Sequence, residues 1–283
     1  MNARNDLLHG LIDYAGLYPP AALDMHTAVR NYLDYCAGPR ASALGRYIVD
    51  LVRLKELRAD AADRLQSMRL SVIVAPGADF RALGRVAAEL PIESVEIKCD
   101  EPLTITGICY QLPEHVERYF EVSLASTCTS SIDALASVDA RAKIRMGGIV
   151  VEAFPSSEDV VRTLHTLADR RVPFKATAGL HHPIRSLHPL TYAADAPRGT
   201  MHGFVNFFCA AAAIYFGEST MIAQTILEEQ DSHAFHFAAD AIGWRSFRWS
   251  ADQVNTIRQE FFISYGSCSF TEPMQDLEAL GWL

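Results

Sequence analysis

Short apolar runs alternate with amphipathic stretches of helical period between residues 46 and 179. The apolar runs are rich in Val, Ile, Tyr and Phe, which is typical of strands. They span residues 46–52, 70–75, 94–99, 119–125, 143–148 and 173–179. Most are followed by a helical pattern that leads back to the next run, and this rhythm predicts a parallel sheet with right-handed crossovers.

The predicted fold class is therefore α/β, as a (β/α)8 TIM-type barrel in one domain over residues 1–283. Residues 1 to about 40 are expected to cap one end. Within them, Asp13, Tyr14 and Tyr18 form either a packing segment or a lid. The rhythm loosens after residue 184, with helices predicted over 204–217 and 220–230 and an ambiguous stretch over 234–249. The last two barrel strands are expected from this irregular C-terminal third.

Charge and composition narrow the class of protein. The chain carries 25 Lys and Arg against 34 Asp and Glu, a net charge of −9, so nucleic acid is not expected as a partner. The longest apolar run, residues 204–217, is too short to cross a bilayer and is interpreted as a core helix or as a subunit interface in a homo-oligomer. Six scattered cysteines without a CxxC pair favour reduced thiols and a cytoplasmic location: Cys36, Cys99, Cys109, Cys128, Cys209 and Cys268.

Charged side chains recur at alternate positions near the ends of three predicted strands. They are Glu96, Lys98 and Asp100, then Lys143 and Arg145, then Lys175 with Thr177. Alternate positions face one side of a strand, and ligands of parallel barrels bind at the carboxyl ends. A lumen filled only for packing prefers Val, Ile and Leu, so these cations require carboxylates, a substrate or water. The structural alternative is that individual lysines form ion pairs with Glu96 or Glu152.

A lysine among other cations in an apolar site has a lowered pKa, and its neutral amine can attack a carbonyl. The stretch "FKATAG", residues 174–179, resembles the K-x-T-x-G strand of deoxyribose-phosphate aldolase and related class I aldolases. The resemblance implies that Lys175 is the Schiff-base residue. Lys143, on the preceding strand, is placed to lower its pKa. The longer run "FKATAGLHHP" with "GSCSF" also resembles an uncharacterised bacterial family, which implies no activity.

The histidine pair His181 and His182 is not part of the aldolase pattern and has three interpretations. One histidine is a general acid or base, one joins Glu96 and Asp100 around a divalent metal ion, or both form hydrogen bonds in a loop before Pro183.

The anion-binding candidates lie at the same strand ends. Arg145 is expected to clamp a carboxylate or phosphate with its two-pronged guanidinium group. The pair Gly147 and Gly148 presents backbone N–H groups, and Ser267 offers a hydroxyl group.

These observations predict a lyase, aldolase-like, that acts on a small anionic carbonyl compound without a cofactor. The predicted catalytic residues are Lys175, Lys143, Glu96 and His181. The predicted substrate-binding residues are Arg145, Lys98, Thr177, His182, Gly147, Gly148 and Ser267. The alternatives are a metal-dependent lyase or hydrolase and a non-catalytic barrel that binds an anion.

Overall fold

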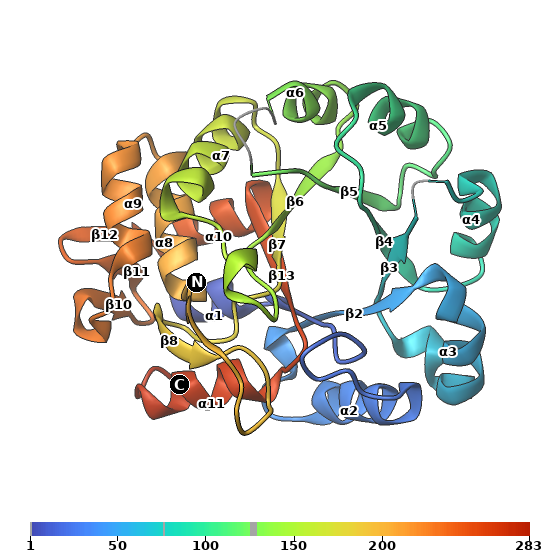
Figure 1. The fold of residues 1–283 in the computed structure, drawn as a ribbon, viewed down its shortest axis with the longest axis horizontal. Helices are drawn as coiled ribbons and strands as arrows, with labels where there is room; N and C mark the ends of the chain where they lie inside the picture. Colours follow the sequence, from blue (N-terminus) through green and yellow to red (C-terminus); the bar gives the residue numbers. More distant parts are fainter. Residues whose placement is uncertain (1, 76, 125–128) are drawn as a thin grey trace.

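Eight parallel strands close into a barrel in the computed structural model, which describes residues 2–75, 77–124 and 129–283 (Figure 1). Around the barrel the order is β1-β13-β7-β6-β5-β4-β3-β2. The strands are β1 (Ile12–Tyr14), β2 (Leu44–Asp50), β3 (Leu70–Val74), β4 (Ile92–Ile97), β5 (Glu117–Glu121), β6 (Arg141–Arg145), β7 (Phe174–Thr177) and β13 (Phe262–Ser267). The predicted (β/α)8 barrel is confirmed.

Helices surround the barrel and connect successive strands (Figure 1). Side-chain caps begin several of them: Asp24 accepts from Thr27 N, Ser156 from Asp159 N, and Ser250 from Gln253 N. The helices of the outer ring are α2 (Met25–Ala37), α3 (Leu54–Ala61), α4 (Phe80–Ala87), α5 (Pro102–Cys109), α6 (Thr129–Ser137), α7 (Ser157–Asp169), α8 (Phe204–Tyr215), α9 (Thr220–Glu228), α10 (Ala251–Glu260) and α11 (Thr271–Ala279).

The N-terminal segment is part of the barrel, which corrects the expectation of a cap over residues 1–40. Ile12–Tyr14 pairs with β13 on one side and β2 on the other, and α2 is the first helix of the ring. In the described part of the chain, the short helix α1 (Ala3–Leu8) precedes β1 and packs against α10. All three residues of β1 are buried, so a strand this short shows no alternation that a sequence pattern could detect.

The C-terminal third contributes one barrel strand, β13, instead of the two expected. Between β7 and β13 lie the hairpin β8 (Ser186–Pro189) and β9 (Arg198–Met201), the helices α8 to α10, and an antiparallel sheet of β10 (Phe235–Phe237), β11 (Ala241–Trp244) and β12 (Phe247–Ser250). This sheet accounts for the ambiguous stretch over residues 234–249.

Helix α8 is a core helix. Every residue from Phe204 to Ile214 is buried within this chain, against α7, α9, α10 and β11. The surface of α8 is therefore already covered and is not available as a subunit interface. In the described part of the chain, none of the helices is long and apolar enough to cross a membrane. Five cysteines are free thiols, and Cys128 lies outside the described residues.

The ends of β6 and β7 approach closely at two glycines. Gly179 has φ +70°, and a Cβ atom on it would lie 2.7 Å from the Met146 carbonyl oxygen and 2.8 Å from the Gly147 Cα. Only glycine fits such a position without strain, because L side chains disfavour positive φ. This contact sets the spacing of the two strand ends that carry Arg145 and Thr177.

Replacing Gly179 with alanine is expected to lower the free energy of unfolding by about 1–3 kcal/mol, from backbone strain and the clash with Met146. Gly107 within α5 is the matched control, because a Cβ there meets no atom within 4 Å. Gly107→Ala is expected to be neutral or slightly stabilising. Urea denaturation measures both, and equal stabilities of the two variants would contradict the prediction.

Candidate active site

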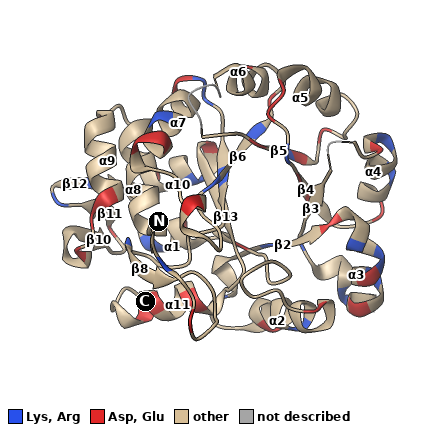
Figure 2. Ribbon diagram, in the orientation of Figure 1, with Lys and Arg blue, Asp and Glu red and all other residues tan. Residues whose placement is uncertain are grey.

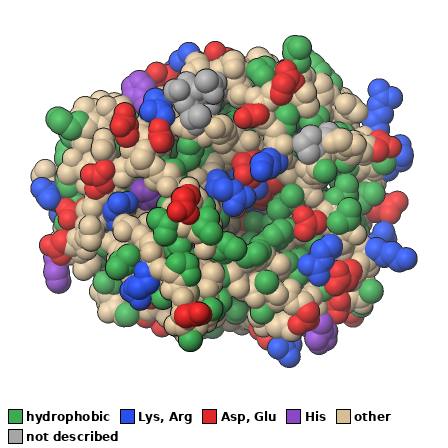
Figure 3. All heavy atoms as spheres, in the orientation of Figure 1, with side chains coloured by type: hydrophobic (Ala, Val, Ile, Leu, Met, Phe, Trp, Pro, Cys, Tyr) green, Lys and Arg blue, Asp and Glu red, His purple; other side chains and the backbone are tan. Residues whose placement is uncertain are grey.

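A cavity of about 320 Å³ opens at the carboxyl ends of the barrel strands, where ligands of this fold bind. Figure 3 looks onto this face and shows a hollow near its middle, with basic and acidic side chains on one side and hydrophobic side chains around it. The lining includes six of the predicted site residues: Glu96, Lys143, Arg145, Gly148, Thr177 and His181. Most of the groups predicted from alternate strand positions therefore lie together at this cavity.

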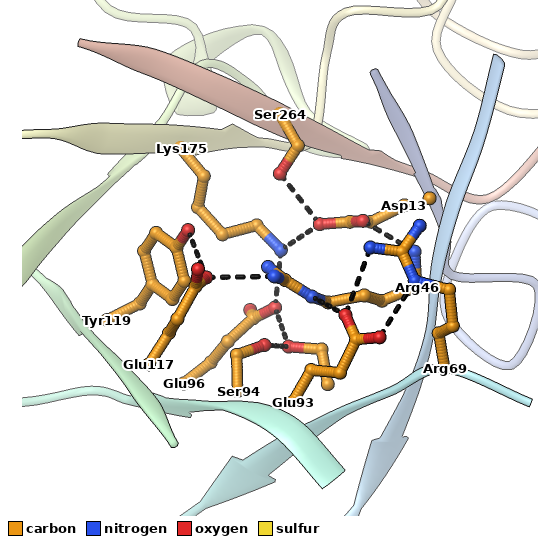
Figure 4. A network of polar contacts seen from close by, with 12 residues as sticks. Asp13, Arg46, Arg69, Glu93, Ser94, Glu96, Glu117, Tyr119, Lys175 and Ser264 are labelled. Carbon is orange, nitrogen blue, oxygen red and sulfur yellow. Dashed lines mark hydrogen bonds and ion pairs between the residues drawn. The ribbon is translucent and has the colours of Figure 1, made fainter. Parts of the chain in front are cut away.

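Lys175 lies beneath the cavity and is fully buried. Its Nζ is 2.5 Å from Asp13 Oδ2 and 2.6 Å from Glu96 Oε1 (Figure 4). Ser264 donates a hydrogen bond to the same Asp13 oxygen, at 2.8 Å. Burial alone would lower the pKa of Lys175, but the charges of Asp13 and Glu96 outweigh it and hold the pKa above its ordinary value.

This result corrects the expectation that Lys175 has a lowered pKa. The expectation assumed other cations as its nearest neighbours, whereas the structure places two carboxylates there. Lys175 is also absent from the residues that line the cavity.

Glu96 joins the two lysines at the floor of the cavity. One carboxylate oxygen faces Lys175, and the other is 2.9 Å from Lys143 Nζ. Ser71 donates a hydrogen bond to Oε1 at 2.7 Å, and Ser94 donates to Ser71. Burial would raise the pKa of Glu96, but the charges of Lys143 and Lys175 lower it well below its ordinary value. Glu96 is therefore an ionised carboxylate in a site shielded from bulk water.

Lys143 faces the cavity between two carboxylates. Its Nζ lies 2.9 Å from Glu96 and 3.1 Å from Glu121, whose other oxygen accepts from Arg145 Nε at 3.1 Å. The strand register pairs Lys143 with Lys175 on β7 and with Glu121 on β5, which explains the cluster. The charges of Lys143 and Arg145 outweigh burial and lower the pKa of Glu121. Alternating charges thus line one side of the cavity floor.

A second set of ion pairs occupies the lumen nearer the amino ends of the strands. Arg46 contacts Glu93 and Glu117, each at 2.9 Å, while Arg141 contacts Glu117 and Arg69 contacts Glu93, each at 2.8 Å. Acidic and basic residues accordingly mark the barrel strands themselves in Figure 2. These groups satisfy one another and do not line the cavity.

The two histidines bind carboxylates of α11. His181 Nδ1 is 2.9 Å from Glu272 Oε2, and His182 Nδ1 is 2.6 Å from Asp276 Oδ2. His181 lines the cavity, whereas His182 stacks on His188 and lines a neighbouring pocket. Burial and the neighbouring His182 lower the pKa of His188 to about 4. A histidine with a carboxylate on Nδ1 has a defined tautomer, which suits His181 to acid–base chemistry.

Among the described residues, His, Cys, Asp and Glu form no group of three or more that is arranged to hold a metal ion. The proposed grouping of Glu96, Asp100 and a histidine is not assembled, because Glu96 faces the lysines and both histidines face α11.

The remaining predicted residues have separate positions. Lys98 is exposed beyond the end of β4 and lines a neighbouring groove with Asp100, Glu121 and Arg145, but not the cavity that Glu96 lines. Gly148 lines the cavity, but Gly147 does not, and a Cβ on Gly147 would strike Phe154. Ser267 is buried outside the cavity lining, where its hydroxyl accepts from Ser269 N.

Asp13 and Glu121 are members of the site that were not predicted from the sequence. Glu121 had a detectable signal, because Glu117, Tyr119 and Glu121 alternate along β5 with the period of a strand. Asp13 had none, since its partner Lys175 is 162 residues away in the sequence. The N-terminal segment also forms part of the cavity wall through Ala15, Tyr18, Pro19 and Pro20.

The fold and the site together define a TIM-type barrel with an ionic cavity at the end where enzymes of this fold carry their active sites. No protein-family model matches the chain, and no curated protein sequence matches it.

Proposed function

We propose that this protein is a lyase, aldolase-like, which acts on a small anionic carbonyl compound through a lysine amine. The observation that carries the proposal is the position of Lys143 on the cavity lining, with Glu96 and Glu121 within 3.1 Å of its Nζ. Lys143 takes the role that was expected for Lys175, because Lys143 lines the cavity whereas Lys175 is fully buried below it.

Lys143 lines the cavity, so its amine is within reach of a carbonyl compound bound there. In the proposed reaction Lys143 releases one proton to solvent in the open cavity, and its neutral amine attacks the carbonyl carbon. The carbonyl oxygen leaves as water with the two remaining amine protons, and the imine nitrogen regains one proton from solvent. The product is a protonated Schiff base that withdraws electrons from the bonds of the adjacent carbon.

Glu96 and His181 are the candidate bases for the next step. Either one accepts a proton from the adjacent carbon or, in carbon–carbon cleavage, from a hydroxyl group one carbon further along the substrate. Arg145, whose side chain is 51% exposed at the rim of the cavity, binds the anionic group of the substrate. Lys175 acts as a positioning residue that holds Glu96 and Asp13 in place.

Reductive trapping tests the proposal directly. The chain has only four lysines, Lys55, Lys98, Lys143 and Lys175, so peptide mapping by mass spectrometry resolves them all. The protein is incubated with pyruvate, 2-oxobutanoate or glyceraldehyde 3-phosphate in the presence of sodium cyanoborohydride. The expected result is a single adduct on Lys143 that is absent from Lys143→Met.

Lys55→Met is the matched control, because Lys55 is exposed on α3 outside the cavity lining and its loss is expected to leave the adduct unchanged. An adduct on Lys175 would overturn the assignment of the amine. The absence of any adduct would contradict the Schiff-base mechanism and favour an anion-binding barrel without this chemistry.

A further inference from the structure

One half of the cavity wall is charged and the other half is apolar. Each half is formed by strands that are neighbours in the barrel. Glu96, Lys143 and Thr177 come from β4, β6 and β7, which lie on one arc of the barrel together with β5. The opposite arc is formed by β13, β1, β2 and β3, and its strands present Gly266, Ile48 and Ile73 to the cavity.

Loops extend the apolar half upward. Ala15, Pro19 and Pro20 follow β1, and Leu190 and Met201 belong to the long connection after β7. This half also holds the buried hydroxyl of Tyr18, which has no hydrogen-bond partner among the described residues, and the thiol of Cys268, whose pKa is raised by burial. This wall therefore offers hydrocarbon surface to a ligand and no charged group.

The apolar surface continues out of the cavity. Ile149 lines the cavity and is 44% exposed, and its neighbours Val150 and Val151 are about half exposed on the same loop after β6. Three consecutive exposed β-branched residues at the mouth of a site are unfavourable in water unless a ligand covers them.

We propose that the substrate is a carbonyl acid with a hydrocarbon side chain, rather than a sugar or a sugar phosphate. This inference rests on the proposed function, which places the carbonyl group at Lys143 and the acidic group at Arg145. The rest of such a molecule must then cross the barrel toward Ile48 and Ile73. A phosphate or a row of hydroxyl groups on that side would lose its water and meet only the Tyr18 hydroxyl and the Cys268 thiol as polar side-chain groups, whereas a methylene chain gains by leaving water.

Binding of a homologous series tests the inference. Straight-chain 2-oxo acids from pyruvate to 2-oxooctanoate are titrated by isothermal calorimetry without a reductant. Each added methylene group is expected to tighten binding about three- to fourfold, until the hydrocarbon chain of the ligand reaches the mouth of the cavity. A polyhydroxylated 2-oxo acid with the same number of carbons as 2-oxohexanoate is expected to bind more weakly than 2-oxohexanoate.

Ile73→Thr replaces part of the apolar wall with a hydroxyl group. It is expected to weaken the binding of 2-oxohexanoate more than the binding of pyruvate. Val52→Thr is the matched control, because Val52 is 89% exposed and lies outside the cavity lining. Its replacement is expected to leave both affinities unchanged. Thermal unfolding checks that both variants fold.

Two results separate this inference from the proposed function. The series is repeated with Lys143→Met, which forms no Schiff base, and the gain with chain length is expected to persist. An adduct on Lys143 with equal affinity along the series would leave the proposed function in place and overturn the hydrocarbon substrate. Preference for the hydroxylated acid, or no binding by any member, would overturn it as well.

Discussion

Replacing Lys175 with methionine is expected to lower the free energy of unfolding by about 3–5 kcal/mol. Methionine is close to lysine in length and leaves no large cavity, so the loss comes from charge. Asp13 and Glu96 would remain buried without the ammonium group that now lies 2.5 and 2.6 Å from their oxygens. Urea denaturation at neutral pH measures the effect.

Lys98→Met is the matched control for this stability measurement, because Lys98 is exposed. Its free energy of unfolding is expected to differ from that of the unchanged protein by no more than about 0.5 kcal/mol. A loss below about 1 kcal/mol in Lys175→Met would show that water or a local rearrangement replaces the ammonium group. Adding Asp13→Asn to Lys175→Met is expected to recover part of the stability, because it removes a buried carboxylate that has lost its ammonium partner, whereas Glu96 keeps Lys143.

The stability deficit of Lys175→Met is expected to shrink in acid. In the unchanged protein Glu96 has a pKa below that of the unfolded chain, so it contributes stability above the ordinary carboxyl pKa that is lost as the pH falls. Without Lys175 the pKa of Glu96 rises, because one of the two charges that lower it is gone while its burial remains. Protonation of Glu96 then removes the cost of its lost ion pair with Lys175, and the two stability curves converge below about pH 4.

Glu96→Gln is expected to slow proton exchange at the carbon next to the substrate carbonyl by about 10²–10⁴-fold. The substitution removes the carboxylate that contacts Lys143 and is a candidate base in the proposed reaction, while the amide keeps an oxygen for the hydrogen bond from Ser71. Proton NMR in D₂O follows the loss of the pyruvate methyl signal, so the measurement does not depend on the identity of the natural substrate.

The variant is expected to fold, because Lys175 keeps Asp13 and Lys143 keeps Glu121 as partners. Glu152→Gln is the matched control, since Glu152 is an exposed carboxylate in the neighbouring groove and its loss is expected to leave the exchange rate unchanged. Exchange by Glu96→Gln within a few-fold of the unchanged protein would move the role of base to another group, such as His181.

The polar lumen was predictable because a strand places alternate residues on one face. Lys143 and Arg145 on β6, and Lys175 and Thr177 on β7, all reach the lumen as the two-residue period requires. Lys98 follows the last residue of β4, Ile97, and lines the neighbouring groove with Glu121 and Arg145 rather than the cavity. The first barrel strand was missed because three buried residues contain too little pattern.

The alternation of apolar and polar residues is enough to specify that this chain forms parallel strands with helices between them, because both periods are local properties of the backbone. It also specifies that lysines and a glutamate point into the same lumen. Which of these groups meet depends on the closed barrel. Asp13, Glu96 and Lys175 come from three strands far apart in the sequence, and closure brings β1 next to β13 and so to the side of β7.

Closure of the barrel also determines which charged groups surround each buried ionisable side chain, and so the direction of its pKa shift. The direction of a pKa shift depends on which charges lie within a few ångströms, and those distances are set by neighbours across the lumen rather than along the chain. Lys175, beside two carboxylates, is held protonated below the cavity, while Lys143 reaches the cavity surface.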